Sequence, residues 1–374
     1  MVTPVSSFTV VPITLFSNES IFVSTGGSIV VPFGDAIDNR TPIGSGVFSY
    51  FNTVTATVLG EVISENTGTA INFSGVSPGG HTVIVGETGT VSSGINYAAV
   101  VLGGAGCVMH NSGQTIGGGG FLGDALSNSR ITNDGSIVGM RYYAMQLSNS
   151  GTTEIINSGT IIGYSAIVLA TSSATIINSG QIRSNAAAKA AIDATTGSAA
   201  FTLRNSGEVA GPGTAIIGSA HADQIRNTGT IDGDVFLGVG HDVFKGKLGE
   251  LVGTLSGDAG SDFLAGGDGD QLIYGGNDND ILNGNAGDDT LFGGSGYDTF
   301  VFSRRGDDDT ISGFQNGTDK LDLSALHFVN FAALSVAAVN VTGGMLIDFG
   351  NQKGGSVFLA GFTEALLDSS DVYL

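Results

Sequence analysis

Hydrophobic residues alternate with polar ones in short runs that follow a recurring Asn-x-Gly tripeptide. Six such units lie between residues 108 and 233, for example IINSGTIIG and IINSGQIRS. Ile and Val at alternate positions predict β-strands with one buried face. Asn and Gly tolerate left-handed backbone angles, so each tripeptide is predicted to be a corner. The asparagines of the six units are Asn111, Asn133, Asn157, Asn178, Asn205 and Asn227.

The spacing of these corners predicts a parallel β-helix with one coil per repeat. The asparagines recur every 21–27 residues, and the amphipathic 3.6-residue period of a helical solenoid is absent. Stacked coils would bury Ile, Val and Leu in a central column, and stacked asparagines would hydrogen-bond as a ladder. Residues 1–107 carry weaker forms of the pattern, so we expect early coils and a cap there.

A second repeat, with a period of nine residues, begins at Gly257. Its five units are GDAGSDFLA, GGDGDQLIY, GGNDNDILN, GNAGDDTLF and GGSGYDTFV. The first position is always glycine, and the fourth is glycine except at Asp278. The sixth position holds Asp262, Gln271, Asp280, Asp289 and Asp298. The eighth holds Leu264, Ile273, Leu282, Leu291 and Phe300, which are expected to point into the core.

Composition restricts the classes of partner. The chain of 374 residues has 34 acidic and 13 basic residues, a formal net charge of -21. Nucleic acid and anionic membrane would be repelled, whereas cations would be attracted. The hydrophobic fraction of 41% is sufficient for a core, so the chain is not a disordered acidic tail. Cys107 is the only cysteine and has apolar neighbours, so we expect a buried, unreactive thiol.

The nine-residue repeat has the chemistry of a calcium site. Residues 257–310 contain twelve aspartates and only two basic residues, Arg304 and Arg305. Carboxylates a few ångströms apart repel one another unless cations lie between them. Calcium takes six to eight oxygen ligands, and a glycine-rich turn is free to direct its carbonyls inward. Thiolate and imidazole clusters are missing, which disfavours zinc and copper.

The five units closely resemble the RTX nonapeptide GGxGxDxUx. The resemblance covers about residues 236–374 and implies a parallel β-roll with several Ca²⁺ ions and 18 residues per coil. It implies that Asp262, Asp280 and Asp298 stack on one side, and Gln271, Asp289 and Asp309 on the other. Gln271 lacks a charge, so its site is expected to be weak or empty. The upstream unit LGVGHDVFK, residues 237–245, is out of register, and we expect no ion there. The residues expected to bind metal are Gly257, Gly260, Asp262, Gly266, Gly267, Gly269, Gly275, Gly276, Asp280, Gly284, Gly287, Asp289, Gly293, Gly294, Gly296, Asp298 and Asp309.

Residues 307–326 resemble the closing segment of serralysin-type RTX domains, and residues 345–374 resemble their terminal cap and uncleaved secretion signal. Asp319 and Asp322 are candidates for a last ion. The end of the chain, Asp371-Val372-Tyr373-Leu374, resembles the uncleaved signal read by type I exporters. No 18-residue apolar stretch exists, so we expect no membrane insertion. The resemblance implies export by a type I system to the extracellular medium or the cell surface, which agrees with the lack of a Sec signal pattern at the N-terminus.

Two functions remain open. The first is a non-catalytic calcium-binding solenoid with a role in adhesion, matrix or cell-surface assembly, binding a glycan or itself. The second is a polysaccharide-acting lyase or epimerase, for which Arg141-Tyr142-Tyr143 is the one suggestive stretch. Acidic candidates are Asp124, Asp134, Glu154, Asp193 and Glu208, and basic ones are Arg130, Arg141, Arg183, Lys189 and Arg204. A serralysin protease is excluded because H-E-x-x-H is absent.

The predicted organisation is all-β, with four parts. Residues 1–107 form the N-terminal cap and irregular coils, and 108–235 form the parallel β-helix. Residues 236–312 form the calcium β-roll. Residues 313–374 form the C-terminal cap and secretion signal.

Overall fold

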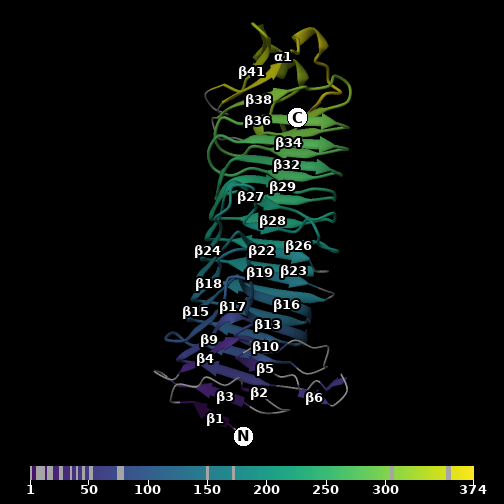
Figure 1. Cartoon of the computed structure of the whole chain (residues 1–374). Helices are drawn as coiled ribbons and strands as arrows, with labels where there is room; N and C mark the ends of the chain where they lie inside the picture. The colour runs from purple at the N-terminus through teal and green to yellow at the C-terminus, as the bar shows by residue number, and fades with distance from the viewer. Residues whose placement is uncertain are drawn as a thin grey trace. The chain divides into compact units, whose positions relative to one another are not determined.

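The structure is a computed structural model. It describes residues 2–5, 13–14, 20–24, 28–33, 36–38, 41–43, 47–49, 54–73, 80–148, 151–170, 173–303, 307–350 and 355–374. Two compact units divide the chain, Met1–Ala215 and Ile216–Leu374. Within each unit the strands stack in parallel rows (Figure 1), so the predicted all-β parallel solenoid is confirmed. None of the helices in these ranges is long and apolar enough to span a membrane.

Each regular coil of the first unit supplies three strands. The first row comprises β8 (Thr55–Val58), β11 (Thr82–Val85), β14 (Val108–Asn111), β17 (Ser129–Asn133), β20 (Thr152–Asn157), β23 (Ser173–Asn178) and β26 (Phe201–Asn205). The second comprises β9 (Glu61–Thr67), β12 (Thr90–Ser93), β15 (Gln114–Gly117), β18 (Ser136–Gly139), β21 (Thr160–Gly163), β24 (Gln181–Ser184) and β27 (Glu208–Ile217). The third comprises β10 (Ile71–Phe73), β13 (Ala98–Ala105), β16 (Gly119–Ser127), β19 (Tyr143–Ser148), β22 (Ser165–Ala170) and β25 (Ile192–Asp193).

The N-terminal strands are shorter. Strands β1 (Val2–Val5) and β3 (Ser20–Val23) pair in parallel and continue to β8. Strand β4 (Ser28–Phe33) pairs with β9, and β2 (Ile13–Thr14) and β5 (Ile37–Asp38) lead to β10. Strands β6 (Thr41–Ile43) and β7 (Val47–Ser49) form an antiparallel pair.

A buried asparagine ladder runs along the end of the first row, as the sequence predicts. The amide nitrogen of Asn111 donates to the side-chain oxygen of Asn133 at 2.7 Å. The bonds from Asn133 to Asn157, Asn157 to Asn178 and Asn178 to Asn205 have the same length. All five are nearly or fully buried, and each donor from Asn111 to Asn178 also reaches a backbone carbonyl of the next coil. These bonds fix the register between coils.

The corner glycines differ from the prediction. The glycines of the N-x-G corners are not left-handed. A Cβ added to Gly159 would lie 2.1 Å from the carbonyl oxygen of Gly135, and one on Gly180 would lie 2.1 Å from that of Gly159. Close stacking of successive corners, and not backbone angle, therefore requires glycine. Cys107 is buried as predicted, with its Sγ 3.3 Å from the Gly103 carbonyl oxygen.

The second unit has two rows of strands. One row comprises β28 (Gln224–Asn227), β30 (Val243–Lys245), β33 (Phe263–Ala265), β35 (Ile281–Asn283), β37 (Thr299–Val301), β39 (Lys320–Asp322) and β43 (Val372–Tyr373). The other comprises β29 (Thr230–Phe236), β31 (Glu250–Val252), β32 (Thr254–Ala259), β34 (Leu272–Asn277), β36 (Thr290–Ser295), β38 (Asp308–Ser312) and β42 (Ser356–Ala360). In one coil this second row is divided into β31 and β32, which both pair with β29. Leu264 pairs with Leu282, which pairs with Phe300, so each of these coils has the predicted 18 residues. All five eighth-position residues are 0% exposed, as predicted.

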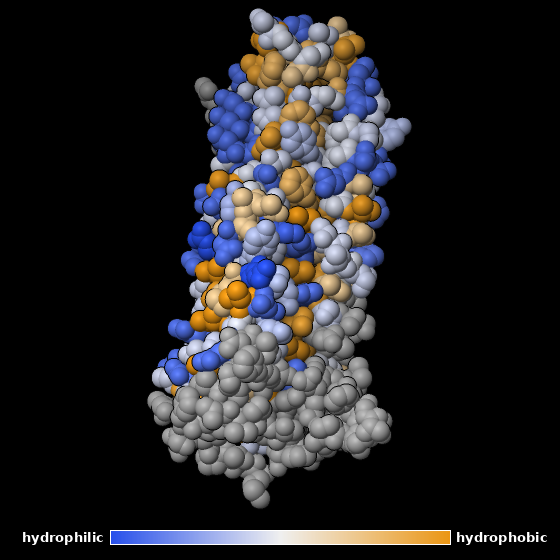
Figure 2. All heavy atoms as spheres, viewed as in Figure 1, coloured by the Kyte–Doolittle hydropathy of each residue, from blue (hydrophilic) through white to orange (hydrophobic). Residues whose placement is uncertain are grey.

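The C-terminal cap ends the second unit. Strands β40 (Ala338–Val341) and β41 (Gly344–Asp348) form an antiparallel extension of β42. Helix α1 (Phe331–Ala337) begins at Asn330, whose side-chain oxygen accepts from the Ala333 N–H. Short 3₁₀ turns lie at Ser324–Leu326 and Glu364–Leu366. On the face drawn in Figure 2, hydrophobic and hydrophilic residues alternate in small groups over the described surface.

Candidate calcium-binding site

The nonapeptide turns need glycine for two physical reasons. At the fourth position Gly260, Gly269, Gly287 and Gly296 have φ between 95° and 137°, where side chains are strained. Asp278 adopts φ 72° at the same position, in the left-handed region that favours glycine. At the first position the reason is space. A Cβ on Gly275 would lie 2.4 Å from the Asp280 Oδ2 and 2.5 Å from the Gly293 carbonyl oxygen. The first-position glycine thus leaves room for the carboxylate.

The sixth-position aspartates stack on one side of the roll. Asp280 Oδ1 accepts from the backbone N–H of Asp262 at 2.8 Å, and Asp298 Oδ1 accepts from that of Asp280 at 3.0 Å. The order that the sequence predicts for Asp262, Asp280 and Asp298 is therefore present. Each is at most 2% exposed. The ladder uses one oxygen of each carboxylate.

The second carboxylate oxygen is left without a partner. Within the described part of the chain, Oδ2 of Asp262, Asp280 and Asp298 is buried and accepts no hydrogen bond. Desolvation by burial raises the pKa of Asp280 to about 7, with neighbouring carboxylates adding to the effect. The same cause raises the pKa of Asp262 and of Asp298 to about 6. A buried carboxylate oxygen with no partner is costly, and a cation would satisfy it.

The ladder continues beyond the repeats at both ends. Asp242 Oδ1 accepts from the Asp223 N–H at 2.6 Å, and Asp262 Oδ1 accepts from the Asp242 N–H at 2.7 Å. Asp319 Oδ1 accepts from the Asp298 N–H at 3.2 Å. Asp242 lies twenty residues before Asp262, so the 18-residue period predicts no ion there. The longer coil absorbs the two extra residues, so spacing alone did not reveal this position.

The two terminal positions are satisfied without an ion. Asp223 accepts from the Ser219 hydroxyl with Oδ1 at 2.9 Å and from the Ser219 N–H with Oδ2 at 2.7 Å. Asp319 Oδ2 accepts from the Gln315 N–H at 2.8 Å. The candidate Asp322 lies elsewhere and accepts from Ser324 at the start of a 3₁₀ turn. Within this ladder, the oxygens without a partner belong to its inner members, which are Asp242, Asp262, Asp280 and Asp298.

The opposite side carries the second predicted stack. Asp289 Oδ1 accepts from the Gln271 N–H at 2.7 Å, and Asp309 Oδ1 accepts from the Asp289 N–H at 3.0 Å. Asp289 Oδ2 is buried without a partner, and burial raises the pKa of Asp289 to about 8 and that of Asp309 to about 7. Both polar atoms of the Gln271 carboxamide have hydrogen-bond partners within its own turn. Its oxygen accepts from the Gly267 N–H at 3.1 Å, and its nitrogen donates to the Asp268 carbonyl at 3.1 Å.

The fifth-position residues form an outer ladder that the sequence analysis did not predict. Asp270 Oδ1 accepts from the Asp288 N–H at 2.8 Å, and Asp288 Oδ1 accepts from the Asp308 N–H at 2.9 Å. On the other side, Asn279 Oδ1 accepts from the Tyr297 N–H at 2.8 Å. These side chains are exposed, so they hold the turns together at the surface and leave the inner carboxylates free.

This arrangement fits calcium. Within the described residues, no cluster of three or more His, Cys, Asp or Glu side chains is arranged to hold a metal. The ligands would therefore be one buried carboxylate oxygen per turn together with backbone carbonyls, which is a donor set that Ca²⁺ accepts. On one side these are Asp262, Asp280 and Asp298 with turns 257–260, 275–278 and 293–296. On the other they are Asp289 and Asp309 with turns 266–269 and 284–287.

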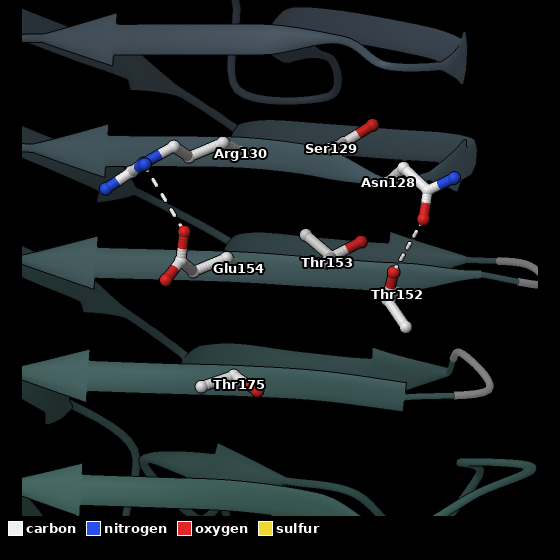
Figure 3. Close-up of a pocket in the computed structure, with 7 residues that line it drawn as sticks. All are labelled: Asn128, Ser129, Arg130, Thr152, Thr153, Glu154 and Thr175. Atoms are coloured by element: carbon white, nitrogen blue, oxygen red, sulfur yellow. Dashed lines mark hydrogen bonds and ion pairs between the residues drawn. The ribbon is translucent and has the colours of Figure 1, made fainter.

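Among the described residues, five of the ten charged candidates of the first unit lie in ion pairs. Figure 3 shows a shallow pocket of about 300 Å³ in which Arg130 faces Glu154 at 3.4 Å and Asn128 accepts from Thr152 at 2.9 Å. Arg183 pairs with Glu208 at 2.9 Å, and His110 lies 3.8 Å from Asp134. Asp193 Oδ1 accepts from both the N–H and the hydroxyl of Thr195. The stretch at Arg141 lies at another pocket, described below.

The fold and these turns define a parallel β-solenoid whose C-terminal unit carries a calcium-binding type of repeat. Residues 253–280 and 266–300 match the RTX calcium-binding nonapeptide repeat, in four copies. This segment therefore consists of RTX repeats, which are typical of secreted proteins. No curated protein has a sequence that matches the chain.

Proposed function

We propose that the protein is a secreted, calcium-binding solenoid whose second unit folds when it meets extracellular calcium. The observation that carries this proposal is the row of buried aspartate oxygens without partners in glycine turns that match RTX repeats. Without a cation these carboxylates must either bind protons or remain charged in a buried site. A ligand that binds only the folded state stabilises it by mass action.

The proposal includes a route of export. The calcium-poor cytosol would leave the repeats unfolded and competent for a type I exporter, which would read the C-terminal segment. Calcium at roughly millimolar concentration outside the cell is sufficient to fill sites of the extracellular class. In the folded unit Asp371 is buried, and its carboxylate accepts from the N–H groups of Gly317 and Asp368. The folded cap would thus hide the acidic residue of the signal, which supports export before folding.

Its proposed role is non-catalytic, in adhesion, matrix or cell-surface assembly through a glycan or a second copy. The pairing of Arg130 with Glu154 and of Arg183 with Glu208 supports this role, because it withdraws these four residues from the base, acid and cations that a lyase or epimerase needs in one groove.

Circular dichroism in chelator and then in calcium tests the coupling. We expect strand content and thermal stability to rise steeply on addition of calcium and to fall again on chelation. Magnesium at equal concentration should have a much smaller effect, because it retains its water ligands. Identical spectra and melting temperatures in chelator and in calcium would refute the coupling. A screen of uronate polymers for turnover separates the binding role from the enzymatic one.

A further inference from the structure

A turn outside the matched repeats shares its second-position backbone angle and its stacking with the calcium turns, whereas its fourth residue, Gly240, does not have the positive φ of Gly260 and Gly296. In residues 237–242, Gly238 has φ 101°, as the second-position glycines Gly276 and Gly294 have 120° and 107°. The Gly240 N–H donates to the Ala259 carbonyl at 2.8 Å, and the Ala259 N–H donates to the Gly238 carbonyl at 2.9 Å. The turn therefore stacks directly on the first nonapeptide turn, 257–262.

Asp242 is the one carboxylate of this turn, and it resembles the inner members of the ladder. It is 1% exposed, and its Oδ2 accepts no hydrogen bond within the described residues. The aspartate one coil earlier, Asp223, is equally buried but has both oxygens bonded to Ser219. Because Asp242 has a buried oxygen without a partner and Asp223 does not, Asp242 is the first aspartate of the ladder that a cation would stabilise.

We infer that Asp242 and the carbonyls of turn 237–240 bind a further divalent cation, calcium by the chemistry of the donors, upstream of residues 253–300. The sequence conceals this site in two ways: Leu237 replaces the first glycine, and the coil to Asp262 has two extra residues. The inference rests on the proposed calcium binding of the repeats.

Counting bound ions on the full chain tests this inference. Native mass spectrometry and calorimetric titration with calcium should give one ion fewer for Asp242→Asn than for wild type, whereas the control Asp223→Asn should lose none. Equal counts for wild type and Asp242→Asn would overturn the inference. Anomalous scattering from wild-type crystals grown in calcium locates the ion without any variant, and no peak beside Asp242 with peaks beside Asp280 would also overturn it. A wild type that binds no calcium at all would instead refute the proposed function.

A separate groove lies in the first unit, on the outer face of β19, β22 and β25. Its volume of about 570 Å³ lies in the range of ligand sites. Its chemistry is set by Arg141, Tyr142, Tyr143, Tyr164, Lys189 and Asp193. Three phenol rings, two cations and one carboxylate therefore face one hollow.

The coil register places the tyrosines in a row. Tyr143 pairs with Ser165, and the Ser165 N–H donates to the Tyr142 carbonyl at 3.0 Å, so Tyr142 and Tyr164 occupy equivalent corners of successive coils. Both are 45% exposed. Successive coils lie about 4.8 Å apart. The groove thus offers two amphipathic rings, one coil apart, to a ligand with apolar faces and a polar rim.

Arg141 is held in place by partners other than a carboxylate. Arg141 Nη1 donates to Asn96 Oδ1 at 2.6 Å, and its guanidinium carbon lies 5.6 Å from the Tyr142 ring centroid. Among the described residues, no carboxylate lies within ion-pair distance of Arg141 or Lys189, in contrast to Arg130 and Arg183. Only eleven of the 34 acidic residues precede Ile216, so most of the repulsion of anions comes from the calcium-binding unit.

We infer that this groove binds an acidic polysaccharide of the uronate class. Pyranose rings present C–H faces that pack on Tyr142 and Tyr164, and the carboxylates of the sugar pair with Arg141 and Lys189. The inference deepens the proposed function, since only an exported protein would meet such a polymer. The groove lies entirely within the first unit, so its binding does not depend on the metal ligands.

Calorimetry with a short oligogalacturonate and an uncharged oligosaccharide of equal length tests the groove on the calcium-loaded full chain. We expect the uronate to bind, and Tyr164→Ala to weaken it about tenfold. Arg141→Gln should weaken the uronate at least tenfold, with Tyr373→Ala, an exposed tyrosine of the second unit, unchanged. Equal affinity for the neutral sugar, or no loss in Tyr164→Ala, would overturn the inference. Circular dichroism on each sample shows whether calcium-dependent folding is intact, so the two proposals fail separately.

Discussion

Replacing Asp280 by Asn should change stability in opposite directions with and without calcium. Asparagine keeps the oxygen that accepts from the Asp262 N–H at 2.8 Å and places an amide nitrogen where Oδ2 lies unpartnered. That nitrogen can donate to a turn carbonyl, as the Gln271 side chain does to the Asp268 carbonyl. The variant removes the buried charge and the metal ligand together.

The magnitude follows from the pKa of Asp280. Burial raises this pKa from 3.8 to about 7, a difference of about three units. At roughly 1.4 kcal/mol per unit, the ionised carboxylate costs the metal-free fold about 4 kcal/mol above pH 7. Imperfect hydrogen bonding of the new amide would offset about 1–3 kcal/mol of this. Metal-free Asp280→Asn should therefore be about 1–3 kcal/mol more stable than wild type. In calcium at a thousandfold excess over Kd, losing one ion removes about 4.1 kcal/mol, so in calcium the variant should be about 1–3 kcal/mol less stable than wild type.

Urea denaturation at pH 7.5, followed by circular dichroism in chelator and in calcium, measures both changes. At pH 5 the metal-free advantage should shrink, because Asp280 in the wild-type fold is then protonated. The control Asp288→Asn removes an exposed carboxylate of the outer ladder. It should change the free energy of unfolding only slightly, and by the same amount in chelator and in calcium. If Asp280→Asn lowers stability equally in chelator and in calcium, Asp280 is a structural hydrogen-bonding group and the metal assignment is wrong.

Three further outcomes follow from the same structure. Gln271→Asp should add one bound calcium ion by native mass spectrometry, because it removes the amide that now donates to the Asp268 carbonyl; an unchanged ion count would contradict this. Metal-free wild type should lose thermal stability as the pH rises from about 4 to about 8, because the raised pKa values of the ladder aspartates let the folded state hold protons that the unfolded state has released. Calcium should abolish this loss. A metal-free melting temperature that rises with pH over this range would contradict the prediction. Asn157→Ala should cost about 2–4 kcal/mol in urea denaturation, because it breaks two 2.7 Å ladder bonds and leaves buried partners unsatisfied, whereas the exposed Asn128→Ala should cost much less.

The repeats gave accurate predictions wherever one coil repeats the length of the next. Between Asp262 and Asp298 each coil has 18 residues, so the columns of the sequence are the columns of the structure. The asparagine ladder was also predictable, although its spacing varies, because each Asn is followed at once by its corner. The prediction failed for Asp242, since two extra residues in its coil break the period while the hydrogen bonds restore the stack.

Two kinds of residue could not be placed from the sequence. Asp270 and Asp288 are exposed turn residues, and each accepts from an N–H of the next coil, a bond between residues 18–20 positions apart that no local pattern predicts. Tyr142 and Tyr164 belong to coils with different loops, and only the pairing of Tyr143 with Ser165 shows that they are neighbours. Which residues of neighbouring coils lie side by side depends on the length of each coil, and a local sequence pattern does not reveal that length.

The amino-acid sequence alone determined the strand pattern, the buried eighth-position column and the type of cation, because each follows from local backbone preference and donor chemistry. The tertiary structure decided which carboxylates need that cation. Ser219 bonds both oxygens of Asp223, and Gln315 bonds the second oxygen of Asp319, each from four residues earlier in the chain. In the folded turn no described donor reaches Oδ2 of Asp242. Burial and hydrogen bonding between coils set the charge of each aspartate, and both arise only when the coils stack.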